Sequence, residues 1–491
     1  MRMHNYRFRH LFAMVASFII GGSAFSLIAQ TPTETPPAPG PKPSFSLPAV
    51  EETVLPNGLR VVVVRKAELP LVTATLLVKS GASSEASKSA GLATATAAML
   101  RKGANGFSAT EFAEKADYLG GYLVTGSNWN SSYAALGVTS DKLGTALSLM
   151  SDAVLRPDFP VKELNLYKKQ SIADIEVGLK RPGTLFELAA SYGEFGEHPV
   201  EGSPKTLKGI SIDQIRKFHA DHYHPDNAVL IFVGDITPSE GTSMARLFFG
   251  GWEKSKNIPI PEPDSLTEGP KPWSDGDTLV RKITVVNLPN SGQSAVGYVK
   301  RIDSGFMDTQ DYYSAQVLHS ILGGGYSARL NQEIRLKRGL SYGARSRFGW
   351  RDHYSNFLAV AQTKDVSAAE VAELVKIEIE KLLTEEALAP EMKARMAVVE
   401  GGFLSSLYTN EGIASQLRTL YAFSVGYDHL NKYLPGVNSI GAGNIKDFSR
   451  RSLAGGDIVI AGDASVFMDD LKKRFPGMEI EVIDAKTFAK K

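Results

Sequence analysis

The sequence predicts an α+β protein built from two similar halves, each with helices packed on a mostly antiparallel sheet. Segments with strand character are followed by runs of helical segments, which is the order typical of α+β folds. A helical segment followed by a strand that ends in Gly-Asp occurs twice, at Gly234-Asp235 and at Gly462-Asp463, 228 residues apart. The stretch 254–279 between the two copies is rich in proline and charged residues. This repetition indicates an internal duplication with a linker at the break.

The composition removes several classes of function before any motif is considered. The 491 residues contain no cysteine and nine histidines, with 54 Lys+Arg against 53 Asp+Glu. The lack of cysteine excludes disulfides, thiolate metal sites and a cysteine nucleophile. The net charge of +1 does not favour nucleic acid as a partner. Any metal site would have to use histidine and carboxylate side chains.

The N-terminus has the pattern of an export signal. Three arginines within residues 1–10 precede an apolar run, Leu11–Ala29, and a basic segment followed by an apolar one is typical of secretory signals. We therefore predict a signal peptide over residues 1–29 and export, with the bacterial periplasm as the compartment. An uncleaved membrane anchor is the alternative, because this run of 19 residues could just span a bilayer.

A proline-rich spacer follows the signal. Residues 31–48 contain seven prolines, which neither continue a helix nor enter the interior of a sheet. The folded part is expected to begin near Val50. The predicted segments after the signal are a Pro-rich linker over 30–49, an N-terminal domain over 50–253, an interdomain linker over 254–280 and a C-terminal domain over 281–485.

In the N-terminal half, the turn Asn57-Gly58 leads into a valine-rich strand, and a second β-branched strand follows. Two capping boxes, Ser108 with Glu111 and Ser211 with Gln214, mark helix starts. The predicted strands are Leu59–Arg65, Leu71–Lys79 and Ala228–Val233, and the predicted helices begin at Ser108, Asp141, Lys162 and Ser211.

The C-terminal half repeats this order of strands and helices. A third capping box is predicted at Ser367 with Glu370. Apolar periodicity and β-branched runs place the remaining elements. The predicted strands are Lys282–Val286, Ser294–Lys300, Tyr342–Phe348 and Asp457–Ala461, and the predicted helices are Asp311–Leu322, Gln332–Lys337, Ser367–Leu383 and Pro390–Tyr408.

Two local patterns invite a functional interpretation. His219, His222 and His224 form a histidine cluster, and the first two share a helix face, so they could bind an ion. We interpret them as helix-end and packing residues, because Pro225 ends the element and no glutamate lies between them as a base. Gly323-Gly324-Gly325 lacks the Lys-Ser/Thr of a phosphate-binding loop and is interpreted as a turn.

A set of short segments carries a family resemblance. The strongest are Leu322–Leu330 and Ile334–Tyr342. The others are Asn57–Arg60, Val78–Gly81 with Ser83-Ser84-Glu85, Ala90–Ala93, Met99–Gly103, Glu197–Pro199, Phe218–Asp226 and Val233–Asp235. Together they resemble the pitrilysin/insulinase family of zinc metallopeptidases, in its processing-peptidase-like branch, over about residues 50–485. The resemblance implies that the two homologous halves form a clamshell around a peptide chamber.

Active members of this family carry an HxxEH motif, in which two histidines bind zinc and the glutamate activates the bound water. Here the histidine positions correspond to Thr94 and Ala98, and the glutamate position corresponds to Ala97. Glu176 stands where the resemblance places the third ligand, and Lys169 replaces the usual supporting acid. A single carboxylate cannot hold zinc, so the resemblance implies a degenerate site, with no metal and no catalytic residue in this chain.

The resemblance also assigns a role to Arg335 and Tyr342, which lie seven positions apart. In the family, an arginine and a tyrosine at this spacing face the zinc across the chamber and contact the bound peptide. Guanidinium and phenol donors suit a carbonyl oxygen that gains negative charge. We therefore expect both residues to bind substrate. On the residues alone, a surface arginine and a half-buried tyrosine are the alternative.

In two-chain members of this family, one subunit carries HxxEH and its partner supplies the Arg/Tyr pair. This chain resembles that partner, so the resemblance implies a non-catalytic, substrate-binding subunit of a heterodimeric zinc metallopeptidase that acts on peptides or unfolded segments. The isolated chain is expected to be inactive, and to contribute to metalloendopeptidase activity with a homologous subunit that carries HxxEH and holds the zinc. No nucleic acid is expected as a partner, and contact with a membrane is expected only through an uncleaved anchor. A stand-alone peptide-binding or structural subunit with no role in proteolysis is the alternative.

Overall fold

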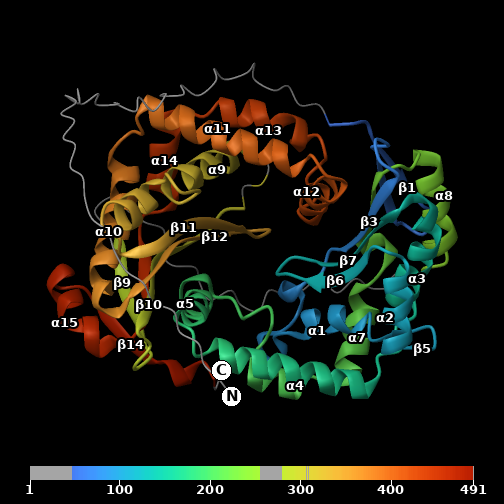
Figure 1. The fold of residues 1–491 in the computed structure, drawn as a ribbon, viewed down its shortest axis with the longest axis horizontal. Coiled ribbons are helices and arrows are strands. Elements are labelled where there is room, and N and C mark those ends of the chain that lie inside the picture. Colours follow the sequence, from blue (N-terminus) through green and yellow to red (C-terminus); the bar gives the residue numbers. More distant parts are fainter. Residues whose placement is uncertain (1–46, 255–278, 306, 308, 490–491) are drawn as a thin grey trace, which may run out of the picture. The chain divides into compact units, whose positions relative to one another are not determined.

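The structure contains two six-stranded sheets, one from each half of the chain (Figure 1). In the N-terminal sheet the strand order is β1-β2-β8-β3-β7-β6, and each neighbouring pair is antiparallel except β2 with β8. Valine and other β-branched residues favour extended backbone in β2 and β3. The strands are β1 (Val50–Val54), β2 (Arg60–Arg65), β3 (Leu71–Val78), β6 (Tyr122–Ser127), β7 (Ser132–Thr139) and β8 (Ala228–Gly234), and a small ribbon pairs β4 (Gly103–Ala104) with β5 (Phe107–Ser108).

The C-terminal sheet has the order β11-β12-β10-β13-β9-β14. The pairs from β11 to β13 are antiparallel, and β9 pairs in parallel with both β13 and β14. The predicted α+β class with mostly antiparallel sheets is thereby confirmed. The strands are β9 (Val280–Asn287), β10 (Gln293–Ile302), β11 (Ser341–Trp350), β12 (Ser355–Lys364), β13 (Gly456–Gly462) and β14 (Ile480–Asp484).

The computed structural model describes residues 47–254, 279–305, 307 and 309–489. The predicted signal peptide, most of the proline-rich linker and most of the interdomain linker lie outside these residues. None of the described helices combines the length and the apolar character that crossing a membrane requires.

Five strands occupy the same order in both sheets, as an internal duplication predicts. The set β2-β8-β3-β7-β6 corresponds to β9-β13-β10-β12-β11. The repeated Gly-Asp pairs follow equivalent strands, because Gly234 ends β8 and Gly462 ends β13. The sixth strand differs, since β1 pairs antiparallel with β2 whereas β14 pairs in parallel with β9.

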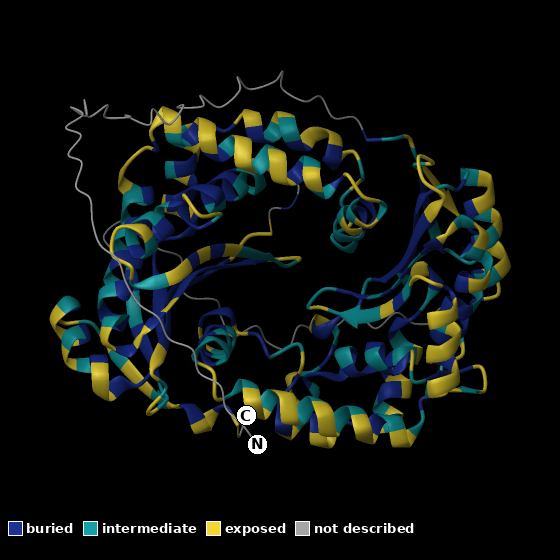
Figure 2. Cartoon of the chain, viewed as in Figure 1, coloured by how far each residue is buried: buried dark blue, intermediate teal, exposed yellow. Residues whose placement is uncertain are grey.

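Helices pack beside the sheets and account for most of the exposed surface in Figure 2, where the strands are mainly in the buried colour. The capping boxes predicted at Ser108 and Ser211 are both formed. The helices of the N-terminal half are α1 (Leu92–Met99), α2 (Ala109–Tyr118), α3 (Leu143–Leu155), α4 (Val161–Gly178), α5 (Pro182–Ala190), α6 (Pro204–Gly209), α7 (Ile212–His222) and α8 (Pro238–Phe249). Those of the C-terminal half are α9 (Gln310–Leu322), α10 (Ala368–Thr384), α11 (Ala389–Ser406), α12 (Asn410–Ala422), α13 (His429–Asn438), α14 (Ala442–Ser452) and α15 (Ala464–Arg474).

Two helices cross between the halves. α5 packs on the C-terminal sheet, where Leu185 and Phe186 share one apolar cluster with residues of β9, β10 and β13. α12 packs in return on β3 and β8 of the N-terminal sheet, and Ile413 and Leu417 join Ile231 in one cluster. All residues of β8 and β13 are buried. A sheet buried on both faces needs a second covering layer, and each half supplies that layer to the other.

Two predicted elements differ in the structure. Ser367 makes no capping hydrogen bond, because it closes a 3₁₀ turn, Asp365–Ser367, with φ −105° and ψ 2°, whereas a capping residue needs extended backbone. The segment predicted as an α-helix over Gln332–Lys337 is instead a π-helical turn, η6, over Asn331–Leu336. A second π-helical turn, η4 (Ser191–Phe195), continues α5.

The crossing of α5 predicts that Gly297 in β10 tolerates no larger residue. A Cβ atom there would lie 2.9 Å from the Phe186 ring and 2.1 Å from the Ala359 carbonyl oxygen. We expect Gly297→Ala to lower the free energy of unfolding by about 1–3 kcal/mol through overpacking, measured by urea denaturation. Gly144→Ala is the control, because a Cβ at Gly144 meets nothing within 4 Å. Equal stability of the two variants would contradict the packing of α5 on β10.

Candidate functional site

The residues of α1 that correspond to the HxxEH motif make packing contacts and hydrogen bonds within the fold. The Thr94 hydroxyl donates a hydrogen bond to the Val200 carbonyl oxygen at 2.8 Å. Ala97 is 0% exposed, and its carbonyl oxygen accepts a hydrogen bond from the Thr125 hydroxyl at 2.6 Å. Ala98 is half-buried and has no donor atom on its side chain. The donor set on α1 therefore does not fit zinc, which needs three protein ligands in catalytic sites.

The predicted third ligand does not complete a site either. Glu176 on α4 is exposed, and so is Lys169. Ile175, the residue before Glu176, packs against the apolar cluster that contains Ala93 and Met99 of α1. The helix thus presents an apolar side chain, not the carboxylate, to the core around α1. Within the described residues no group of three or more His, Asp or Glu side chains is arranged to hold a metal ion.

A buried carboxylate that the sequence argument did not single out holds the start of α1. The Glu85 side chain accepts hydrogen bonds from the backbone N–H groups of Gly91 at 2.7 Å and Ala93 at 2.5 Å. Burial raises the pKa of Glu85 to about 8, although these hydrogen bonds oppose the shift. His198 Nδ1 lies 3.7 Å from Glu85, and burial lowers the pKa of His198. Glu85 therefore anchors α1 by hydrogen bonds to its orphan N–H groups.

Arg335 and Tyr342, predicted as a pair, are brought together by the fold. The Arg335 guanidinium lies over the Tyr342 ring, 4.7 Å from its centroid, and over the Tyr326 ring at 4.8 Å. Tyr342 is 88% exposed and Tyr326 is 60% exposed. Two rings that flank a guanidinium leave its N–H donors directed outward in the plane of the group. This arrangement presents donors and two phenols to solvent, and Tyr326 is a member that the sequence argument missed.

Local backbone features position this group. The pairing of β11 with β12 shifts register between Ser341 and Ala344, and bulges of this kind redirect side chains. The amide of the buried Asn331 donates to the Gly325 carbonyl oxygen at 2.9 Å and to that of Ala344 at 2.8 Å, and it accepts from the Ala344 N–H at 2.9 Å. Asn331 thereby joins the glycine turn to β11. Its presence inside a helix-like segment was the available sequence signal, since asparagine there often bonds to backbone elsewhere.

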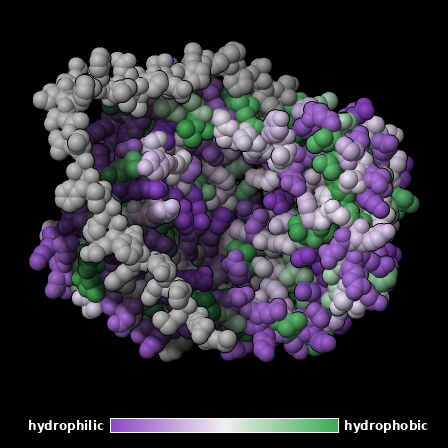
Figure 3. Space-filling view, in the orientation of Figure 1, coloured by the Kyte–Doolittle hydropathy of each residue, from purple (hydrophilic) through white to green (hydrophobic). Residues whose placement is uncertain are grey.

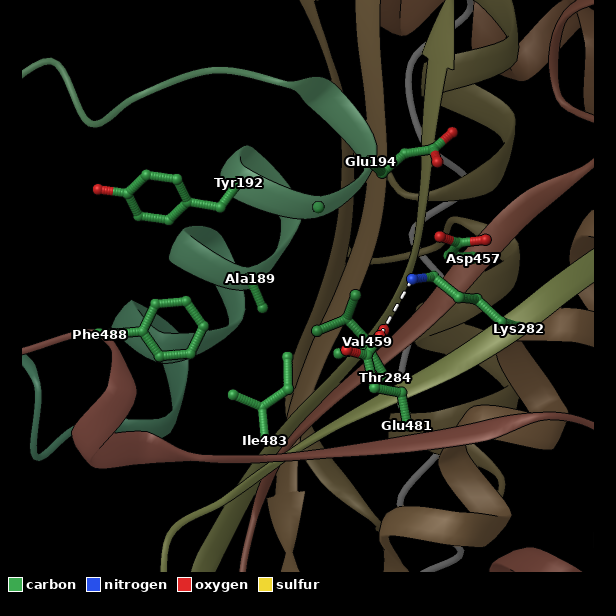
Figure 4. Close-up of a pocket in the computed structure, with 11 residues that line it drawn as sticks. Ala189, Tyr192, Glu194, Lys282, Thr284, Asp457, Val459, Glu481, Ile483 and Phe488 are labelled. Carbon is green, nitrogen blue, oxygen red and sulfur yellow. Dashed lines mark hydrogen bonds and ion pairs between the residues drawn. The ribbon is translucent and has the colours of Figure 1, made fainter. Parts of the chain in front are cut away.

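The crossing segment from α5 to η4 is fastened to the C-terminal half by three carboxylates. Glu187 pairs with Arg347 at 2.6 Å, Glu194 pairs with Arg281, and Glu197 pairs with an arginine beyond β11. Figure 4 shows Glu194 at one end of a cavity of about 200 Å³ and the rings of Tyr192 and Phe488 at the other end. The sequence argument assigned none of these carboxylates a role, because their partners lie far away along the chain.

Glu197 makes the most complete of these contacts. Its carboxylate accepts two hydrogen bonds from Arg351, at 2.6 and 2.9 Å, one from the Tyr354 hydroxyl at 2.9 Å and one from the Asn356 amide at 2.7 Å. A bidentate pair with further donors offsets the cost of burying the charge. Three residues later, Val200 contacts α1, so the segment ties the degenerate site to the C-terminal sheet.

The histidine cluster has a structural role. His219 Nε2 is 2.8 Å from the Val154 carbonyl oxygen, and its ring stacks on Tyr223 with centroids 4.8 Å apart. Burial lowers the pKa of His219 to about 4. His222 packs against Phe218 at 4.4 Å. These contacts agree with the interpretation as helix-end and packing residues for His219 and His222, whereas the buried Nε2 atom of His224 has no hydrogen-bond partner among the described residues.

Loss of the Glu197 charge is expected to destabilise the protein. Glu197→Gln leaves the buried Arg351 guanidinium without its carboxylate, so we expect the free energy of unfolding to fall by about 3 kcal/mol, measured by urea denaturation. The control is Glu201→Gln, four residues further at an exposed position, where a change within about 0.5 kcal/mol is expected. Similar values for the two variants would show that the segment is not held by this pair.

Glu194 is expected to make stability depend on pH. Burial and the nearby Asp457 carboxylate raise the pKa of Glu194 to about 7, while Arg281 and Lys300 oppose the shift. The folded state then binds the proton more tightly than the unfolded state, so this contribution to stability is present below about pH 4.5 and is lost as pH rises to about 7. Between pH 5 and 8, wild type should lose stability relative to Glu194→Gln in urea unfolding. Parallel pH curves for the two proteins would contradict the assignment.

Two models of one peptidase family match the sequence. "Insulinase (Peptidase family M16)" matches residues 60–188, and "Peptidase M16 inactive domain" matches residues 209–394. Among curated relatives, the uncharacterized zinc protease YmxG of Bacillus subtilis is 26% identical over 293 residues, which are 58% of this chain and 67% of the relative. The uncharacterized zinc protease SCO5738 of Streptomyces coelicolor is 25% identical over 307 residues, 61% of this chain and 65% of the relative. The chain thus spans about two thirds of the length of these relatives.

Solved structures share the fold. A peptidase M16 inactive domain from Pseudomonas fluorescens has a TM-score of 0.74 at 25% identity, with 84% of this chain and 98% of that chain covered. A protease from Helicobacter pylori has a TM-score of 0.77 at 19% identity, with 85% and 100% covered. With both family models matched, the two-sheet fold shared and the zinc donors absent from α1, this chain belongs to peptidase family M16, as a member of the non-catalytic type.

Proposed function

We propose that this chain is the substrate-binding, non-catalytic subunit of a two-chain zinc peptidase whose other subunit carries HxxEH. One observation carries the proposal: α1 lacks zinc donors, whereas the half-buried Arg335 lies against two exposed tyrosines, Tyr342 and Tyr326. The reaction class is supported by the relatives, which are named zinc proteases.

The chemistry of the group suits a peptide carbonyl. The guanidinium of Arg335 is permanently charged, and its flanking rings limit the side-chain motion that binding would otherwise have to restrict. The Tyr342 hydroxyl can donate a hydrogen bond to a carbonyl oxygen as that oxygen gains negative charge. Zinc in the partner subunit would supply the activated water. In this proposal Arg335 and Tyr342 orient the peptide and stabilise charge, and they transfer no proton in the reaction.

The place of action is part of the proposal. We propose that the complex works after export, because residues 1–29 combine a basic start with an apolar run. An extended or unfolded peptide is the substrate class, since backbone groups are recognised most readily in an extended chain.

The proposal predicts activity only in a mixture. The full chain alone should not cleave an unstructured peptide, and adding it to the HxxEH-bearing homologue from the same cell should raise cleavage. Arg335→Ala and Tyr342→Phe should each lower kcat/KM of the mixture by about 100-fold, as the loss of one donor to a developing oxyanion does. The assay is peptide hydrolysis followed by fluorescence.

Two matched variants serve as controls for this assay. Arg338→Ala removes a nearby arginine that pairs with Glu333, and Tyr408→Phe removes the hydroxyl of another tyrosine that is 81% exposed. Both should leave kcat/KM unchanged. Partner activity that is indifferent to this chain would refute the proposal and favour a stand-alone binding or structural role. Stoichiometric zinc in the isolated chain would overturn the assignment of α1.

A further inference from the structure

An uncharged cavity lies where the crossing helix α12 meets α9, α11, α13 and the end of β11. It has a volume of about 400 Å³, within the range of about 300–1,000 Å³ found for ligand sites. Hydrophobic residues on the face seen in Figure 3 lie in small groups separated by hydrophilic ones. A cavity can therefore bury an apolar group of a ligand more completely than that open surface can. Figure 1 shows α9, α11 and α13 grouped on one side of β11, with α12 beside them.

The lining of this cavity is aromatic. Tyr312 lies 5.2 Å from Trp350 and 6.1 Å from Tyr433, and Phe403 stacks on Tyr433 at 4.0 Å, all measured between ring centroids. These four rings come from α9, β11, α11 and α13. Ring faces and edges arranged in this way attract a further aromatic ring in stacked or edge-to-face contact.

No acid, lysine or arginine is among the described residues that line the cavity. Several of its polar groups are hydrogen-bonded within the protein: Gln416 donates to the Ser406 hydroxyl at 3.0 Å, and the Ser320 hydroxyl donates to the Arg395 carbonyl oxygen at 3.1 Å. His319 Nδ1 lies 3.0 Å from the Ser346 hydroxyl, and burial lowers the pKa of His319. A charged side chain would find no counter-ion here, whereas a neutral ring would lose little solvation.

One of two adjacent glycines in α11 borders the cavity. Gly401 and Gly402 lie inside the helix, where each glycine costs about 1 kcal/mol relative to alanine. A Cβ at either position would meet nothing within 4 Å. Gly402 lines the cavity and Gly401 does not. A side chain at Gly402 would therefore project into open cavity space without a clash.

The cavity adjoins the Arg335 group. Gly324 lines it, and Tyr326 follows only two residues later, a separation of at most about 7 Å along the chain. Tyr312 lies at the other end of α9 from Gly324, about 18 Å away along the helix, so a peptide held by its backbone at Arg335 and Tyr342 could run along the cavity and place a side chain several residues away among the rings.

We propose that this cavity is a specificity subsite that receives one aromatic side chain of the bound peptide. The inference rests on the proposed function, because it presumes that a peptide binds at Arg335 and Tyr342. It adds the substrate class: extended peptides with Phe, Tyr or Trp near the bound backbone segment.

The test compares two probes on the full chain without a partner. Both are fluorescent ten-residue peptides of Gly, Ser and Ala, and one carries a single central Phe where the other has Ala. Fluorescence anisotropy should show the Phe peptide binding about tenfold tighter or more, as expected for burying one aromatic side chain. Gly402→Leu should abolish this preference, and Gly401→Leu should keep it. Thermal melting of both variants checks that they fold as wild type does.

Each result decides the matter. Equal affinity of wild type for the two peptides overturns the subsite, and so does a preference that survives Gly402→Leu or is lost equally in Gly401→Leu. If the Ala peptide is still cleaved in the mixture with the HxxEH partner, and cleavage still falls with Arg335→Ala, the proposed function stands without the subsite. If neither peptide binds, both the subsite and the proposed function fail.

Discussion

The two halves depend on an exchange of covering helices. α5 supplies the second face of the C-terminal sheet, and α12 supplies that of the N-terminal sheet. Both sheets have strands that are buried throughout. Without the helix supplied by the other half, each sheet would therefore expose apolar surface to water. The Glu–Arg pairs of the crossing segment fix its orientation against the C-terminal sheet, since a buried ion pair tolerates little change in geometry. The same segment ends at the contact with α1, so the exchange also positions the degenerate site.

The two candidate regions have changed in different ways. On α1, small residues fill the former ligand positions, and Thr94 has become part of a hydrogen bond that holds the crossing segment. Around Arg335, the rings, the bulge in β11 and the Asn331 contacts form an exposed and ordered group. Packing within the fold is enough to explain the small buried residues on α1. Packing does not require two exposed phenols against one guanidinium. This contrast is the physical basis for treating the chain as half of a composite site.

The duplication gives both halves one scaffold with different uses. α1 follows β3 in the N-terminal half, and α9 follows β10 in the C-terminal half, at equivalent places in the strand order. The first borders the degenerate zinc site and the second borders the uncharged cavity. A repeated fold can therefore border different surroundings at equivalent places, because the side chains on equivalent helices vary without a change in strand pairing.

The sequence by itself determined the fold class, the duplication, most element positions and the loss of zinc donors at Thr94, Ala97 and Ala98. The first three follow from local periodicity, capping and residue chemistry, which act over a few positions, and the loss of zinc donors follows from the family resemblance. Only the tertiary structure decided that Glu176 faces solvent, that Tyr326 completes the Arg335 group and that Glu197 binds Arg351. Each of these depends on which face of an element is buried, or on contacts between residues distant in the chain. Such contacts depend on tertiary packing, so no local pattern in the sequence encodes them.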